Sequence, residues 1–113
     1  MTEISSICVY CGSGPGNDPA FMQAAADLGR SLAEHKIALV YGGANVGLMG
    51  RVARSTLEHG GYVTGIIPDF LKSRELMLDT IQETITVPDM HTRKRMMYER
   101  ADAFIALPGG VGT

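Results

Sequence analysis

The chain has 113 residues, of which 45% are hydrophobic and 19% charged. This length fits one small domain, and the hydrophobic content excludes a wholly disordered chain. A formal net charge of −2 excludes a general electrostatic attraction for nucleic acid. No apolar run reaches the roughly 18 residues of a membrane helix, and the acidic start Met1-Thr2-Glu3 argues against a secretory signal. We therefore expect one cytoplasmic domain without a nucleic-acid or membrane partner.

The first part of the chain alternates apolar runs with helical periodicity. Ile4–Tyr10 is short and apolar, and we predict a strand that ends in a glycine-rich loop. Asp18 followed by Pro19 is typical of a helix start, and apolar side chains then recur at helical spacing up to His35. Ile37–Tyr41 is continuously apolar, as a strand in a parallel sheet requires because both of its faces are buried.

The rest of the chain repeats this alternation. The predicted elements are a helix over Leu48–Glu58 ended by Gly60-Gly61, a strand over Tyr62–Ile67 stopped by Pro68, a short strand over Thr84–Val87, a basic helix over Met90–Arg100 and a strand over Ala103–Leu107. Such alternation predicts an α/β, Rossmann-like three-layer fold with a parallel sheet and right-handed connections. Because the last glycine-rich turn has no helix after it, we expect residues 1–113 to be the N-terminal part of a longer single domain, incomplete at its C-terminus.

The two cysteines, Cys8 and Cys11, form a C-x-x-C pattern. A redox pair and half of a zinc site are both compatible with this spacing. Zinc would need two more ligands, and the sequence has no second cysteine pair or close histidine pair. A thioredoxin-type motif opens a helix, whereas Cys8 lies inside an apolar run. We therefore predict reduced, structural cysteines and no metal site.

Glycine-rich turns follow three of the predicted strands, after Tyr10, Tyr41 and Leu107. The carboxyl ends of parallel strands meet at one edge of a sheet, where backbone N–H groups can approach a phosphate. The candidate residues in the first two turns are Ser13, Gly43 and Asn45. Glycine also serves tight turns for steric reasons alone, but three such turns at one edge favour a phosphate-bearing ligand. None has the G-x-G-x-x-G pattern in the dinucleotide register or the G-x-x-x-x-G-K-[ST] pattern, which disfavours NAD and Walker-type sites.

Two motifs resemble those of the LOG family, the cytokinin riboside 5′-monophosphate phosphoribohydrolases, whose members are often described as lysine decarboxylases. Residues 90–94 are similar to the M-H-x-R-K motif, and residues 108–113 to P-G-G-x-G-T. Residues 11–13 and 41–50 resemble the family's other blocks, so the resemblance covers essentially the whole chain. It implies a Rossmann-like homodimer without a cofactor. The implied reaction is hydrolysis of the N-glycosidic bond of AMP or N6-prenylated AMP, giving the free base and ribose 5-phosphate.

The same resemblance implies roles for individual residues. Arg93 corresponds to the catalytic arginine, Lys94 lies beside it in the substrate site, and Glu75 matches a substrate contact. The implied phosphate-binding turn consists of Gly109, Gly110, Val111, Gly112 and Thr113. A catalytic glutamate of the family lies beyond Thr113. An arginine can hold phosphate or ribose oxygens, and a carboxylate can stabilise positive charge that develops on the ribose.

Plainer interpretations stand beside these. The arginines and lysine of residues 93–100 could form an ordinary solvated basic face, and the motif outweighs that interpretation only for Arg93 and Lys94. Glu75 could be a surface acid, since its role rests on register alone. Lys36, Lys72 and Lys94 are the only lysines, and none is in a setting typical of a Schiff base, so lysine decarboxylation is not expected. The alternative function is a non-catalytic carrier of a nucleotide or of molybdenum cofactor, which a similar fold would serve.

Overall fold

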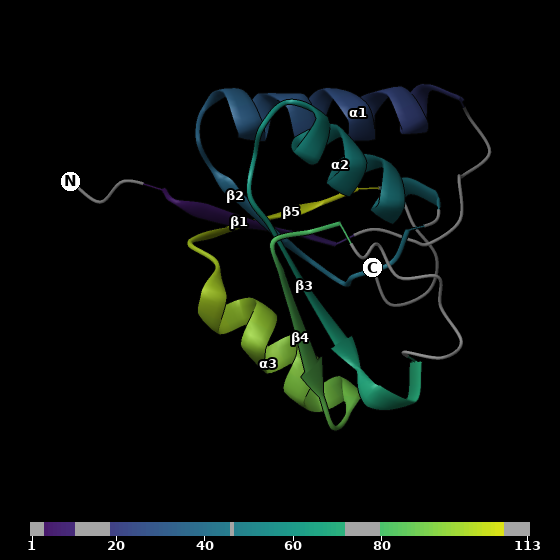
Figure 1. Cartoon of the computed structure of the whole chain (residues 1–113), viewed down its shortest axis with the longest axis vertical. Helices are drawn as coiled ribbons and strands as arrows, with labels where there is room; N and C mark the ends of the chain where they lie inside the picture. The colour runs from purple at the N-terminus through teal and green to yellow at the C-terminus, as the bar shows by residue number, and fades with distance from the viewer. Residues whose placement is uncertain (1–3, 11–18, 46, 72–79, 108–113) are drawn as a thin grey trace.

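A computed structural model describes residues 4–10, 19–45, 47–71 and 80–107. These form one sheet of five parallel strands with helices on both faces (Figure 1). The strands are β1 (Ser6–Tyr10), β2 (Ala38–Tyr41), β3 (Val63–Pro68), β4 (Glu83–Val87) and β5 (Ala103–Ala106), and their spatial order is β4-β3-β2-β1-β5. The predicted α/β, three-layer fold with a parallel sheet is confirmed.

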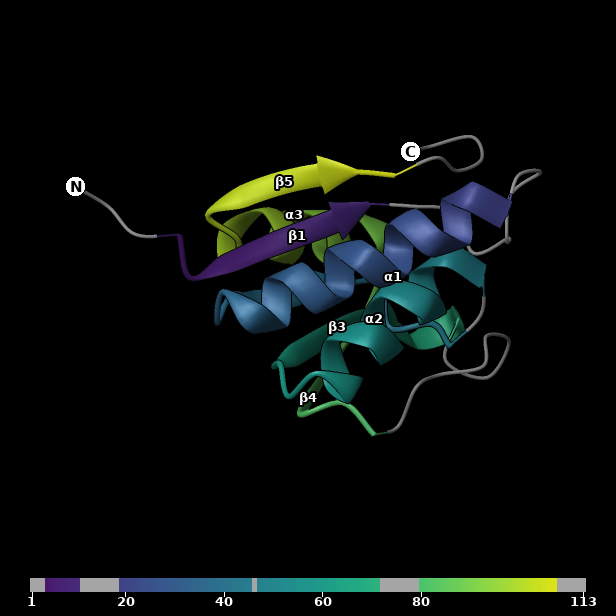
Figure 2. The same ribbon diagram turned by 90° about the horizontal axis from the view of Figure 1, so that it is seen from above.

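Helices α1 (Pro19–Glu34) and α2 (Gly47–Glu58) cover one face of the sheet, and α3 (Met90–Arg100) covers the other, as Figures 1 and 2 show. A single 3-10 turn, η1 (Asp69–Leu71), follows β3. The chain first builds the sheet outward from β1 to β4, and the connection through α3 then returns to the opposite side of β1. Right-handed connections that run in opposite directions place their helices on opposite faces, which explains the three layers.

Side-chain alternation along the strands divides the core between the two faces of the sheet. Leu39 and Tyr41 are fully buried against the layer that contains α1 and α2, whereas Val40 packs with Ile66 and Met97 on the side of α3. Both faces of β2 are therefore apolar, because successive residues of a strand point to opposite sides. The continuous apolar run that predicted this strand follows directly from its central position.

The ends of the elements lie within two residues of the predicted ends, and α3 has the predicted bounds. Pro68 was predicted to stop the third strand, but it is the last residue of β3 and pairs with Val87 of β4. A proline is tolerated there because it lies at the end of the strand, where the loss of its N–H interrupts no further pairing. The predicted glycine signal at the end of α2 is confirmed: Gly60 has a φ of +83°, and its N–H donates to the carbonyl oxygen of Leu57 at 3.0 Å.

Candidate functional site

The turn that follows β2 lies at the carboxyl edge of the sheet. The buried hydroxyl of Tyr41 donates to the carbonyl oxygen of Ala44 at 3.0 Å and closes this turn. Gly43 has a φ of +90°, a backbone conformation that residues other than glycine rarely adopt. The second of the predicted glycine-rich turns is therefore a fixed structure at the predicted edge, and its backbone requires glycine at position 43.

Arg93 reaches this turn from α3 on the opposite face of the sheet. Asp89 caps α3 by accepting a hydrogen bond of 2.7 Å from the N–H of Thr92, which lowers the pKa of its carboxyl. In the first turn of the helix, the Arg93 side chain turns inward and is only 8% exposed. Its Nε donates to the carbonyl oxygen of Ile66 at 2.9 Å, and its Nη2 donates to that of Gly42 at 2.6 Å. The guanidinium thus joins the carboxyl ends of β2 and β3.

The absence of a side chain at Gly42 makes room for this guanidinium. A Cβ at position 42 would overlap Nη2 of Arg93 and would lie 3.1 Å from the sulfur of Met49. Gly42 was not among the predicted site residues, because a glycine-rich turn does not reveal which of its glycines meets a distant side chain. The pairing emerges only when α3 and β2 are placed side by side.

The other basic residues of α3 lie on its outer surface. Lys94 is exposed, because consecutive residues of a helix point about 100° apart. Arg95 forms an exposed ion pair with Glu99 at 3.6 Å, and Arg100 forms one with Glu83 at 3.1 Å. A solvated basic face is therefore correct for Arg95 and Arg100 and wrong for Arg93. The substrate-binding role of Lys94 stays a prediction.

Asn45 ends the turn and is held by a second arginine, from α2. Nη1 of Arg54 donates to the side-chain oxygen of Asn45 at 2.7 Å and to its carbonyl oxygen at 3.0 Å. The glycine-rich pattern predicted Asn45 and Gly43 as site residues but not Arg54, which lies nine residues beyond Asn45. Helical spacing alone predicts that Arg54 lies on one face of α2, and not that its guanidinium returns to the start of the helix.

The remaining predicted site residues, Ser13, Glu75 and the turn 109–113, lie outside the described residues. The strands that lead into the first and third glycine-rich turns are neighbours, because Tyr10 pairs with Ala106. The N–H of Leu107 then donates to the carbonyl oxygen of Tyr10 at 2.7 Å. Together with β2, these strands confirm that the three turns begin at one edge of the sheet, next to the point where the strand order reverses.

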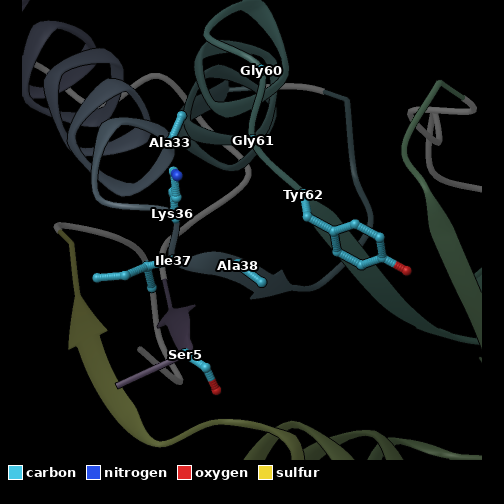
Figure 3. Close-up of a pocket in the computed structure, with 8 residues that line it drawn as sticks. All are labelled: Ser5, Ala33, Lys36, Ile37, Ala38, Gly60, Gly61 and Tyr62. Carbon is cyan, nitrogen blue, oxygen red and sulfur yellow. The ribbon is translucent and has the colours of Figure 1, made fainter. Parts of the chain in front are cut away.

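A separate hollow of about 230 Å³ lies at the opposite edge, where β2 and β3 begin (Figure 3). Backbone at Gly60 and Gly61 forms part of its wall, and Lys36 and Tyr62 contribute polar groups that are exposed. It shares no residue with the turn after β2. In the described part of the chain, no three histidine, cysteine, aspartate or glutamate side chains gather as a metal site would require. Within the same ranges, no helix is long and apolar enough to cross a membrane.

Cys8 is an unpaired, fully buried thiol in the middle of the sheet. Burial raises the pKa of this thiol to about 11, although a hydrogen bond with Tyr10 opposes the effect. The thiolate is the reactive form of cysteine, so burial and the raised pKa both disfavour reaction of Cys8 at neutral pH. This agrees with the predicted structural role, while Cys11 lies outside the described residues.

Residues 49–113 match the model of a protein family described as "Possible lysine decarboxylase". The chain belongs to this family. It is 52% identical over 112 residues to the cytokinin riboside 5′-monophosphate phosphoribohydrolase LOG7 of Arabidopsis thaliana, which covers 99% of this chain and 52% of that protein. It is 50% identical over 110 residues to a probable cytokinin riboside 5′-monophosphate phosphoribohydrolase, LOG4, of Oryza sativa subsp. japonica, covering 97% of this chain and 48% of that protein. The chain thus spans about half the length of these relatives.

Among solved structures, the molybdenum cofactor carrier protein of Chlamydomonas reinhardtii is similar, with a TM-score of 0.82. The two sequences are 21% identical, and the match covers 97% of this chain and 66% of the carrier protein. At this level of identity the likeness shows a common fold and no more. The resemblance to the LOG family that the motifs predicted is confirmed by the family match and by these relatives.

Proposed function

We propose that the protein hydrolyses the N-glycosidic bond of a nucleoside 5′-monophosphate, AMP or an N6-substituted AMP, to the free base and ribose 5-phosphate. The observation that carries this proposal is the 52% identity, over 99% of the chain, to a relative named for a reaction of this kind. The buried guanidinium of Arg93 at the carboxyl edge of the sheet supports it, because ligands of open parallel sheets bind at this edge.

Cleavage of the bond between ribose C1′ and the base develops positive charge on the ribose, as in other glycoside hydrolyses. A glutamate beyond Thr113 would stabilise that charge and orient the attacking water. Arg93 would contact the ribose phosphate or assist departure of the base from a position that two main-chain carbonyls hold in advance. The proposed mechanism uses no metal and no organic cofactor.

The phosphate would lie against the glycine-rich edge. In this proposal Ser13, Gly43 and Asn45 and the turn 109–113 surround the phosphate, while Glu75 and Lys94 contact the substrate. Main-chain N–H groups of glycine turns and the positive end of a helix both favour an anion.

We further propose that the chain is part of a longer cytoplasmic domain that forms a homodimer. The outermost strand β5 supports the first point: Phe104 is 43% exposed there, although strands of parallel sheets are usually covered. The exposed aromatic rings of Phe104 and Tyr98 stack with centroids 5.5 Å apart, which suits a covered surface.

A carrier of nucleotide or molybdenum cofactor is the second candidate, and the shared fold with the Chlamydomonas carrier favours it. Base release distinguishes the two functions. We would incubate the intact protein with AMP and with isopentenyl-AMP and follow free base and ribose 5-phosphate by chromatography. Release of base from either substrate is expected, whereas saturable binding without base release would overturn the hydrolase proposal in favour of a carrier.

Arg93→Ala and Arg95→Ala form a matched pair of variants for this assay. Both remove an arginine from α3, but only Arg93 is buried against the turn after β2, whereas Arg95 is exposed. Loss of one preorganised cation should slow base release about 100-fold in Arg93→Ala. Arg95→Ala should stay within about twofold of the parent protein. Equal activity of the two variants would remove Arg93 from the mechanism.

A further inference from the structure

Arg54, Gly50 and Asn45 form one packed unit at the start of α2. The side chain of Arg54 runs back along the helix, as helical side chains tend to do, and passes over Gly50 one turn earlier. A Cβ at position 50 would first meet the main chain of Asn45, whose carbonyl carbon is nearest and whose carbonyl oxygen would lie at 2.7 Å, and then Nη1 of Arg54 at 2.8 Å. Glycine at this position therefore allows the guanidinium to reach both oxygens of Asn45, at 2.7 and 3.0 Å.

This contact fixes the orientation of the Asn45 side chain. An arginine has donors and no acceptor, so the carboxamide must turn its oxygen, not its nitrogen, toward Arg54. The nitrogen Nδ2, which carries two donors, is thereby directed away from Arg54. Among the described residues, Nδ2 donates to no partner, and it stands at the carboxyl edge beside Gly43. A group that offers only N–H donors at this edge suits a ligand whose polar atoms are hydrogen-bond acceptors.

The charge around this unit also suits an anion. The guanidinium of Arg54 lies at the beginning of α2, where the helix dipole is positive, and the first turn of α2 has no acidic residue. Within the described ranges, Arg54 forms no ion pair. A cation at the positive end of a helix is unfavourable by itself, and a bound phosphate would offset this cost.

We propose that Arg54 is a positioning residue that holds Asn45 with Nδ2 as a hydrogen-bond donor to the phosphate of the nucleotide. The identity of the ligand rests on the proposed function. Because Arg54 acts through Asn45, removing Arg54 and removing the Asn45 side chain abolish the same phosphate contact. Their effects on phosphate binding are therefore not additive.

The test measures binding of ribose 5-phosphate and of free adenine to the intact protein by calorimetry, together with KM and kcat for AMP. The variants are Arg54→Met, Asn45→Ala and their combination, and Arg51→Met is the matched control. Arg51 lies on the same helix with the same charge, but it pairs with Glu58 at 3.4 Å and does not contact Asn45. Unfolding curves establish that each variant is folded before its binding is compared.

Loss of one hydrogen bond to a charged group corresponds to about a tenfold weakening. We expect Arg54→Met and Asn45→Ala each to weaken the binding of ribose 5-phosphate about tenfold. The double variant should bind it no more than about twofold more weakly than either single variant. KM for AMP should rise in parallel while kcat changes little, and adenine binding and Arg51→Met should be unaffected.

Any of three results would overturn the inference. Arg54→Met would bind ribose 5-phosphate as tightly as Arg51→Met does, the effects of the two single substitutions would multiply in the double variant, or the binding of adenine would weaken as much as that of ribose 5-phosphate. Binding of ribose 5-phosphate that depends on Arg54, without release of base from AMP, would refute the proposed hydrolysis and leave this inference intact. A parent protein that binds neither AMP nor ribose 5-phosphate would refute both.

Discussion

Substitution of Gly42 by alanine tests the placement of the Arg93 guanidinium directly. The added Cβ would occupy the position of Nη2, and the neighbouring sulfur of Met49 at 3.1 Å restricts movement on that side. The arginine side chain is flexible, so it can move away, but only by giving up its hydrogen bond to the carbonyl oxygen of Gly42. The guanidinium would then leave the end of β2.

The expected cost follows from the contacts that are lost. A hydrogen bond made by a charged group contributes about 1.5–3 kcal/mol, and a buried partner left without one adds to the cost. We therefore expect Gly42→Ala to lower the free energy of unfolding by about 2 kcal/mol. If Arg93 serves the proposed reaction, kcat should fall between about tenfold and 100-fold, because a displaced cation no longer faces the substrate.

A double-mutant cycle isolates the contact. Gly42→Ala is made in the parent protein and in Arg93→Ala, and urea unfolding gives the free energy of unfolding of all four proteins. In the Arg93→Ala background the Cβ has space, so the cost of Gly42→Ala should shrink by at least about 1 kcal/mol. An equal cost in both backgrounds would refute the steric argument, whatever the protein catalyses.

Three further predictions concern stability and reactivity. Lys36, at the end of α1, has a φ of +57°, a conformation that favours glycine. In urea titrations, Lys36→Gly should therefore raise the free energy of unfolding by about 0.5–1 kcal/mol, whereas Gly60→Ala at the equivalent end of α2 should lower it. Cys8 should resist alkylation by iodoacetamide at pH 8 in the native protein, as peptide mass analysis will show. Because its pKa is raised, the free energy of unfolding should fall as pH rises from about 9 toward 11, and this slope should be smaller in Cys8→Ala. Hydrogen bonds from Ser5 and Ser6 lower the pKa of Asp102, so this carboxylate should contribute stability that is present at neutral pH and lost as pH falls through its folded-state pKa. In Asp102→Asn the free energy of unfolding, measured between pH 7 and 3, should therefore depend less on pH.

The fold could be predicted because its determinants are local. Apolar runs such as Ile37–Tyr41 are long enough for a strand and too short for a helix, and helical spacing identifies α1 and α2 without reference to the rest of the chain. Pro68 shows where this reasoning fails. Whether a proline ends a strand depends on whether the adjacent strand requires a hydrogen bond from its missing N–H. Pro68 still pairs with Val87 of β4, and this pairing is not visible in the local sequence.

The candidate site could be predicted only in part, because its contacts join distant residues. The M-H-x-R-K motif identified Arg93, but the local charge pattern alone favoured a solvated helix face. Its actual partners are 51 and 27 residues away, at Gly42 and Ile66. No periodicity within α3 indicates that one of its arginines faces the sheet while its neighbours face solvent.

The two arginines of the site share one structural principle. Arg93 approaches the turn after β2 from α3, and Arg54 approaches it from α2. These two helices lie on opposite faces of the sheet (Figure 1). Each arginine donates to a main-chain carbonyl of the turn, which any residue at those positions would supply. What the sequence must provide is space, because a Cβ at Gly42 would meet Arg93, and a Cβ at Gly50 would meet both the main chain of Asn45 and Arg54. The glycines, more than the residues that accept the hydrogen bonds, therefore specify where the positive charge lies at this edge.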